Sequence, residues 1–377
     1  MGETTQPHIL IVDDEADQER SALDQWKAAA HFTVLHPQDV THDDIWEADV
    51  VLVDYRIEYW PQRDNIGTLS LQPQDGLALA AILRAHARSA PSPTAFALRS
   101  AHLNELFRPL PPESRLHILA RALNLEWVFS KSSSSGMVEM VHQVVTLASA
   151  IRNLPPTWPL DNLDETRRLV EQFMAIPEDA SWAGQAWQDV EACHPPIHEL
   201  VEQSHGLAFL RWLLHRILPY PCFLWDTYRL AARLRVTHAS LRSALDSNFS
   251  SLLEPCRYKG ALIDFLGLRW WRCGIEAFIW ELTEGEPFDP QRIRGLLAQR
   301  TGILLEPTIS LQPLVCVDEN YQPLSEACDP AEAVRIQPDD WPPYAEPAWT
   351  TLKLAREHPR LKALVLEQDR EQFIEDC

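Results

Sequence analysis

The chain has 377 residues, of which 46% are hydrophobic, and its formal net charge is −21. This length favours two or more domains, and because neither half of the chain is basic, a large nucleic-acid-binding surface is disfavoured. Charged residues interrupt every long apolar stretch, which excludes an obvious membrane span. The polar start and seven cysteines without paired spacing lead us to expect a reduced, cytoplasmic protein.

Four short apolar runs predict buried strands of an α/β domain, and each run ends on polar residues. The runs are 8–14, closing on Asp13 and Asp14; 49–54, closing on Asp54; 94–100, closing on Ser100; and 127–131, closing on Lys131. Ligands bind outside the carboxyl ends of strands in an open parallel sheet. The sequence therefore predicts one polar site at this edge.

These residue types suit phosphoryl chemistry. Asp13 and Asp14 are the kind of carboxylates that hold Mg²⁺, which prefers oxygen ligands. Asp54 can act as a nucleophile that accepts a phosphoryl group. Ser100 and Lys131 would stabilise the charge on the transferring oxygens. We therefore expect Asp54 to be the phosphoacceptor.

Five short motifs occur in a characteristic order. They are Ile-Val-Asp-Asp-Glu at 11–15, Leu-Val-Asp at 52–54, Asp-Gly at 75–76, Ser-Ala at 100–101 and Ser-Lys at 130–131. Together they resemble the receiver domain of two-component response regulators over residues 7–153. The resemblance implies a flavodoxin-like fold with five parallel strands, and a histidine kinase or phosphotransfer protein as phosphodonor.

The same resemblance assigns roles to individual residues. It implies that Mg²⁺ is held by Asp13, Asp14 and Asp54 together with the backbone carbonyl of Arg56. Arg56 and His102 occupy positions that tune the lifetime of the phosphoryl group, so we expect an altered autodephosphorylation rate.

The chain departs from the family pattern near this site. Insertions lie at 58–74 and around 108–115, and Ser132 follows the lysine where proline is usual. A remodelled partner surface is expected. A domain that has lost phosphorylation and serves only as an interaction module is the alternative.

The rest of the chain has a different pattern. The prolines of 154–162 predict a linker, and helical apolar spacing predicts a helical output domain over 163–300. A C-terminal extension, 301–377, is expected to pack on that domain, with short irregular or β segments. The expected helices are 163–176, 198–218, 223–235, 238–253, 261–282 and a closing helix near 349–367.

Residues 230–245 resemble a helix-turn-helix. Thr237, His238, Ser240 and Arg242 would face the major groove of DNA. Arg235 stands where such turns favour glycine, and an ordinary helical hairpin gives the same pattern.

The sequence as a whole predicts a response regulator that accepts a phosphoryl group on Asp54, with Mg²⁺ as cofactor, and signals through protein contacts of its C-terminal domain to an unknown partner. A DNA-binding transcription regulator and a phosphate sink that buffers a relay are the alternatives. A homodimer is compatible with each of them. No nucleophile–base pair or phosphate-binding loop indicates an enzymatic output.

Overall fold

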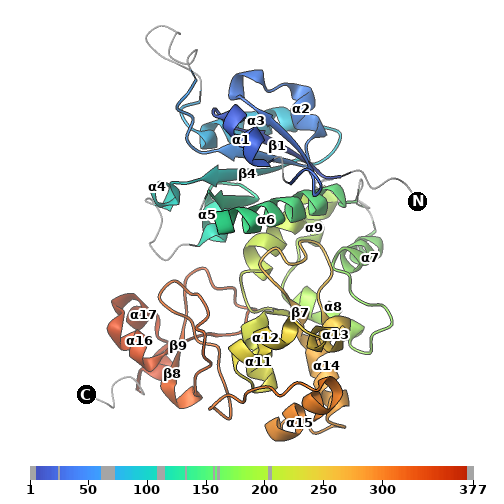
Figure 1. Ribbon diagram of the computed structural model, residues 1–377, viewed down its shortest axis with the longest axis vertical. Helices are drawn as coiled ribbons and strands as arrows, with labels where there is room; N and C mark the ends of the chain where they lie inside the picture. Colours follow the sequence, from blue (N-terminus) through green and yellow to red (C-terminus); the bar gives the residue numbers. More distant parts are fainter. Residues whose placement is uncertain are drawn as a thin grey trace. The chain divides into compact units, whose positions relative to one another are not determined.

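The computed structural model describes residues 6–23, 26–60, 73–107, 115–131, 134–155, 158, 162–202 and 206–371 (Figure 1). Contacts divide the chain into two compact units. The first comprises 1–173, 196–215 and 264–266, and the second comprises 174–195, 216–263 and 267–377. Much of the predicted linker, 154–162, lies outside the described residues, and the predicted domain boundaries stay predictions.

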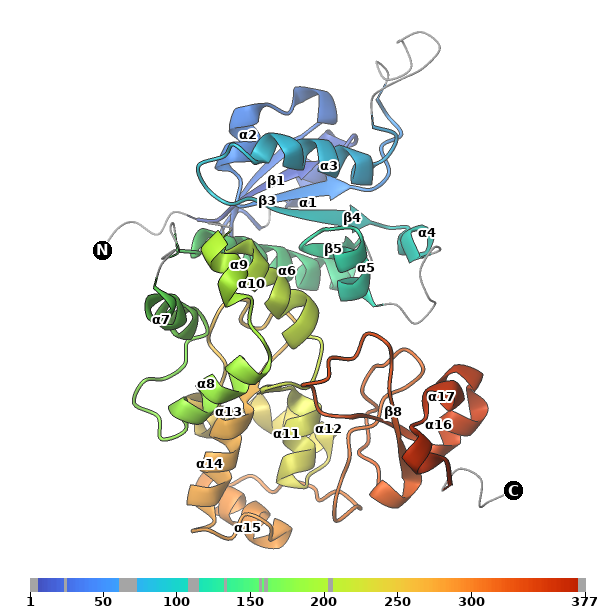
Figure 2. The ribbon, with the colours of Figure 1, turned by 180° about the vertical axis from the view of Figure 1, so that it is seen from behind.

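The first unit contains a parallel five-stranded sheet. Its strands are β1 His8–Val12, β2 His31–Leu35, β3 Val50–Asp54, β4 Ala95–Ser100 and β5 Trp127–Ser130. Their order is β2-β1-β3-β4-β5, as in flavodoxin-like folds (Figure 2). The predicted sheet is confirmed, and each polar run end lies at its carboxyl edge.

The strands β1, β3, β4 and β5 are buried on both faces, whereas in the edge strand β2 only Val34 is buried. Alternate residues point to opposite sides, and one face packs on α2 His42–Glu47, α3 Gly76–Ala87 and α5 Leu116–Ala122. The long helix α6 Ser134–Arg152 contacts β1, β3 and β5. Buried parallel strands read as continuous apolar runs, which is why the sequence located β1, β3, β4 and β5. The edge strand β2 has no such run, and only the family resemblance implied it. The short helices α1 Ala16–Leu23 and α4 Leu103–Phe107 complete this part.

Helices from further along the chain also belong to the first unit. They are α7 Leu163–Phe173, α9 Ile197–Glu202 and α10 Leu207–Trp212, with the π-helical turn η3 Leu213–Ile217 beginning at its border. Arg211 of α10 donates from Nε to Glu126 Oε1 at 2.7 Å, and His215 Nε2 lies 2.9 Å from the Glu126 carbonyl oxygen. The Phe265 ring meets Trp127 edge to face at 5.0 Å. These contacts attach the later segments to the beginning of β5.

The second unit is mainly helical with small sheets, as predicted. Its elements up to residue 301 are α8 Ala183–Ala192, β6 Leu224–Trp225, α11 Thr227–Leu234, α12 His238–Leu245, α13 Phe249–Leu253, η4 Glu254–Cys256, β7 Trp270–Trp271, α14 Arg272–Leu282 and α15 Pro290–Thr301. The continuous helix expected over 261–282 is wrong. Leu262, Asp264 and Gly267 have positive φ, and Trp270–Trp271 pairs with β6 before α14 begins.

The end of the chain forms its own apolar cluster around β8 Ala333–Ile336, β9 Ala348–Thr351, α16 Leu352–Glu357 and α17 Pro359–Leu364, flanked by the turns η5 Pro330–Glu332 and η6 Glu367–Asp369. The closing helix expected near 349–367 is therefore wrong as one element. Thr351 caps α16, and Pro359 starts a new helix because proline cannot continue an existing one. In the described parts of the chain, no helix is long and apolar enough to cross a membrane.

Candidate functional site

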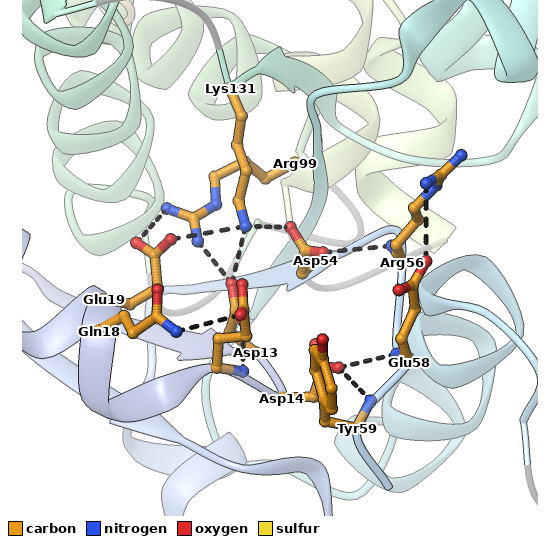
Figure 3. Close-up of polar contacts among 11 residues, drawn as sticks. Asp13, Asp14, Gln18, Glu19, Asp54, Arg56, Glu58, Tyr59, Arg99 and Lys131 are labelled. Carbon is orange, nitrogen blue, oxygen red and sulfur yellow. Dashed lines mark hydrogen bonds and ion pairs between the residues drawn. The ribbon is translucent and has the colours of Figure 1, made fainter.

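The polar residues predicted from the strand ends do meet at one edge of the sheet. A pocket of about 290 Å³ is lined by Asp14, Glu15, Asp54, Arg56, Glu58, Tyr59, Ser100, Ala101, His102 and Lys131. Asp13 is almost fully buried beside it. Figure 3 shows Lys131 and Arg99 both directed at Asp13.

Lys131 is the cation that joins the buried carboxylates. Its Nζ lies 2.7 Å from Asp54 Oδ1 and 3.0 Å from Asp13 Oδ2, and Glu19 Oε1 is 3.5 Å away. Burial and Arg99 lower the pKa of Lys131, but Asp54 and Asp13 outweigh them and hold this pKa above its usual range. The lysine is therefore charged and positioned at the acid that we predicted as phosphoacceptor.

Asp13 and Asp54 respond to burial differently. Burial raises the pKa of Asp13, but Lys131, the Glu15 backbone N–H and Arg99 together hold it below its usual value. Burial raises the pKa of Asp54 to about 6, although Lys131 opposes this. The ionised form of Asp54 is thus less stabilised than that of Asp13, and Asp54 is mostly ionised only above about pH 6.

Arg99 is a site residue that the sequence analysis missed. It lies inside β4, is 0% exposed, and donates from Nη2 to Asp13 Oδ2 at 2.7 Å and from Nη1 to Glu19 Oε2 at 2.9 Å. The sequence feature that could have revealed it is that Arg99 is the one charged residue in an otherwise apolar strand ending at Ser100.

Asp14 lines the same pocket, and its carboxylate is held by the backbone of the inserted segment. Its Oδ2 accepts the backbone N–H groups of Glu58 and Tyr59 at 2.7 and 2.6 Å, as Figure 3 shows. Among the described residues, no three His, Cys, Asp or Glu side chains are arranged to hold a metal ion. Both oxygens of Asp13 and of Asp54, and Oδ2 of Asp14, already accept a cation or a backbone N–H group. These carboxylates, as placed, are a poor fit for Mg²⁺, which would have to displace those donors.

The two predicted tuning residues lie at the rim. The Arg56 backbone N–H donates to Asp54 Oδ2 at 3.2 Å, and its guanidinium pairs with Glu105 and, at 3.5 Å, with Glu58. The His102 backbone N–H donates to Ser100 Oγ at 2.9 Å. Their predicted effects on phosphoryl lifetime, and the predicted Arg56 carbonyl contact, stay predictions. Most of the insertion at 58–74 and of the segment around 108–115 lies outside the described residues.

Gly76 positions Asp54 through close backbone packing. It is the first residue of α3, its N–H donates to the Tyr55 carbonyl at 2.8 Å, and a Cβ there would lie 1.8 Å from the Asp54 carbonyl oxygen. Gly76→Ala is expected to reduce the free energy of unfolding by about 1–3 kcal/mol or more, because the backbone must move to make room for the methyl group. Urea unfolding measures this loss.

The matched control for that change is Gly295→Ala. Gly295 is exposed within α15 and has open space around it. Alanine in an open helix position stabilises by up to about 1 kcal/mol relative to glycine. Equal effects at both positions would contradict the packing argument.

The predicted helix-turn-helix is present as two helices, α11 and α12, but its polar residues are engaged within the protein. Thr237 caps α12, and the Ser240 hydroxyl accepts the Glu306 backbone N–H at 3.0 Å. The His238 ring stacks on Tyr228 with centroids 3.8 Å apart. Arg242 alone of the four is exposed, so this geometry gives DNA binding no support.

Comparisons with known proteins give no family. No protein-family model matches the chain, and no curated protein matches it. One similar solved structure is a yeast Spc42 trimeric coiled coil, amino acids 181–211, fused to another structure. The identity is 14%, the match covers 46% of this chain and 93% of that one, and the TM-score is 0.25, so the similarity carries no argument about fold or function.

Proposed function

We propose that residues 7–153 form a receiver domain of the response-regulator type, in which Asp54 accepts a phosphoryl group. The observation that carries the proposal is the 2.7 Å ion pair between Lys131 Nζ and Asp54 Oδ1 at a polar pocket that Ser100 also lines. The sheet order and the order of the motifs support the same assignment.

The chemistry needs three groups. An Asp54 carboxylate oxygen attacks the donor phosphorus and forms a P–O bond, while the bond from phosphorus to the leaving group breaks and that group takes the electron pair. Lys131 places positive charge beside the transferring oxygens. Ser100 accepts the His102 N–H and can still donate its own hydroxyl hydrogen.

Contacts at the other end of β5 support an output within the chain. Lys131 follows β5 directly. At the other end of the strand, Glu126 accepts hydrogen bonds from Arg211 and His215, and the Trp127 ring contacts the Phe265 ring. We infer that a shift of Lys131 on phosphorylation is passed along this four-residue strand to α10 and thus to the C-terminal region. A histidine kinase or phosphotransfer protein is the proposed donor, and an unidentified protein is the proposed target.

Chemical phosphorylation tests the acceptor. Incubating the full chain with acetyl phosphate, with and without Mg²⁺, is expected to add one phosphoryl group that is hydrolysed in alkali and removed by hydroxylamine, as for an acyl phosphate. Intact-mass spectrometry measures it. Asp54→Asn is expected to abolish labelling, whereas Asp17→Asn, at an exposed acid of α1, is expected to leave it unchanged.

Labelling that persists in Asp54→Asn would contradict the acceptor assignment. The output is read separately by hydrogen exchange, in which residues 207–215 are expected to change protection when Asp54 is phosphorylated. An unchanged exchange pattern there would refute the output through β5 while leaving the acceptor in place.

A further inference from the structure

A buried arginine is unusual at this place in the fold. Arg99 lies in β4 between β3 and β5, and its ladder partner in β3 is Asp54. The rest of β4 from Ala95 to Leu98 is apolar and buried. Since a buried guanidinium is costly unless it is paired, Arg99 is held there by its partners.

Those partners come from two other elements. Asp13 follows β1, and Glu19 lies in α1, so the guanidinium bridges the sheet edge and a covering helix. Asp13 is 1% exposed, so its charge is compensated by Arg99 and Lys131 and not by solvation. Within the described residues, Arg99 Nε finds no hydrogen-bond acceptor, so the two terminal nitrogens carry the pairing.

Five of the six carboxylate oxygens of Asp13, Asp14 and Asp54 already accept a cation or a backbone N–H group. Asp13 Oδ2 receives both Arg99 and Lys131, and its Oδ1 accepts the Glu15 N–H at 2.9 Å. Asp14 Oδ2 accepts two backbone N–H groups, and Asp54 Oδ2 accepts one. Mg²⁺ requires near-octahedral oxygen coordination and gives up its water reluctantly. To bind at Asp13 it would have to displace these donors and lie beside both Arg99 and Lys131.

We propose that Arg99 is a built-in cation beside this pocket, which takes the place of a divalent metal as the counter-charge of Asp13 and leaves the folded protein with little affinity for Mg²⁺. The inference concerns the cation and does not depend on whether Asp54 is phosphorylated. It departs from the expectation, drawn from the sequence, that Mg²⁺ is bound by Asp13, Asp14 and Asp54.

Magnesium titration of the full chain tests the proposal. Titration calorimetry with MgCl₂ up to millimolar concentrations, and thermal melting with and without the same salt, are expected to show no binding and no shift for the wild type. Arg99→Met keeps a long apolar side chain but removes the charge. It is expected to lower Tm without metal, and to recover roughly 5 °C or more when Mg²⁺ saturates the freed carboxylates.

The matched control is Arg88→Met, at an exposed arginine that follows α3. It is expected to behave as the wild type in both measurements. Saturable Mg²⁺ binding by the wild type, with a rise in Tm, would overturn the proposal. A folded Arg99→Met protein that stays insensitive to Mg²⁺ would overturn it as well.

A second variant covers the case in which Arg99→Met does not fold. Glu19→Gln weakens one of the two pairs of Arg99 and leaves Asp13, Asp14 and Asp54 in place. It is expected to lower Tm by several degrees and to remain insensitive to Mg²⁺; an unchanged Tm would refute the pairing. Phosphorylation of Asp54 that occurs only with Mg²⁺ would overturn this proposal but not the receiver assignment. Absence of any labelling would overturn the receiver assignment but not this proposal.

Discussion

Asp13→Asn is expected to reduce the free energy of unfolding by about 3 kcal/mol at pH 7. Removing one partner of a buried ion pair typically costs about 3–5 kcal/mol, because the other charge is left uncompensated. The lower end applies here, since Glu19 still pairs with Arg99. Urea unfolding of the full chain, followed by circular dichroism, measures the change.

The sign of this effect is diagnostic. In a pocket of carboxylates that lacks its cation, neutralising one acid relieves repulsion and stabilises the fold. With Arg99 and Lys131 both on Asp13 Oδ2, neutralisation instead removes attraction. Asp17→Asn is the control, because Asp17 is 94% exposed and its pair with Arg20 is worth at most about 1 kcal/mol. A stabilised Asp13→Asn protein would show that Arg99 does not depend on Asp13.

Asp54→Asn is expected to have the opposite effect and to stabilise the protein by about 2–3 kcal/mol above about pH 7. Burial raises the pKa of Asp54 from 3.8 to about 6. Between these two values the folded state binds more protons than the unfolded state, so the wild type loses stability as the pH rises through this window. Asparagine does not ionise, so the variant does not lose stability as the pH rises through this window.

The pH dependence separates this explanation from a simple packing effect. The difference between Asp54→Asn and the wild type is expected to be near zero at about pH 4 and to grow until about pH 7. Unfolding curves in urea at several pH values measure it, with Asp17→Asn as the exposed control. A difference that is the same at both ends of the range would mean that the ionisation of Asp54 is not its cause.

The sequence located β1, β3, β4, β5 and the position of the site because buried parallel strands leave apolar runs and their ends gather at one edge. It did not locate β2, because this edge strand has only Val34 buried and leaves no apolar run. Asp54, Ser100 and Lys131 lie around one pocket, as this reasoning requires. The DNA-contacting role suggested for residues 237–242 receives no support from the structure. Helix capping by Thr237 and ring stacking by His238 produce the same residue pattern.

The interior of the site could not be predicted in the same way. An arginine near a strand end usually reaches solvent, and only the fold brings Asp13 and Glu19 within reach of Arg99. The orientation of Asp14 depends on the backbone of Glu58 and Tyr59, which belong to an inserted segment without a regular pattern. The Trp270–Trp271 strand was missed because a two-residue strand and a helical turn cannot be told apart by periodicity.

The attachment of residues 196–215 and 264–266 to the beginning of β5 has a consequence for how this sheet can be used. A fragment ending near residue 153 would lack Arg211 and Phe265, and would leave the buried Glu126 carboxylate and the Trp127 ring without these partners. The sheet is therefore not a self-contained unit. Transferring it to another protein would require residues 196–215 and 264–266 to be transferred with it.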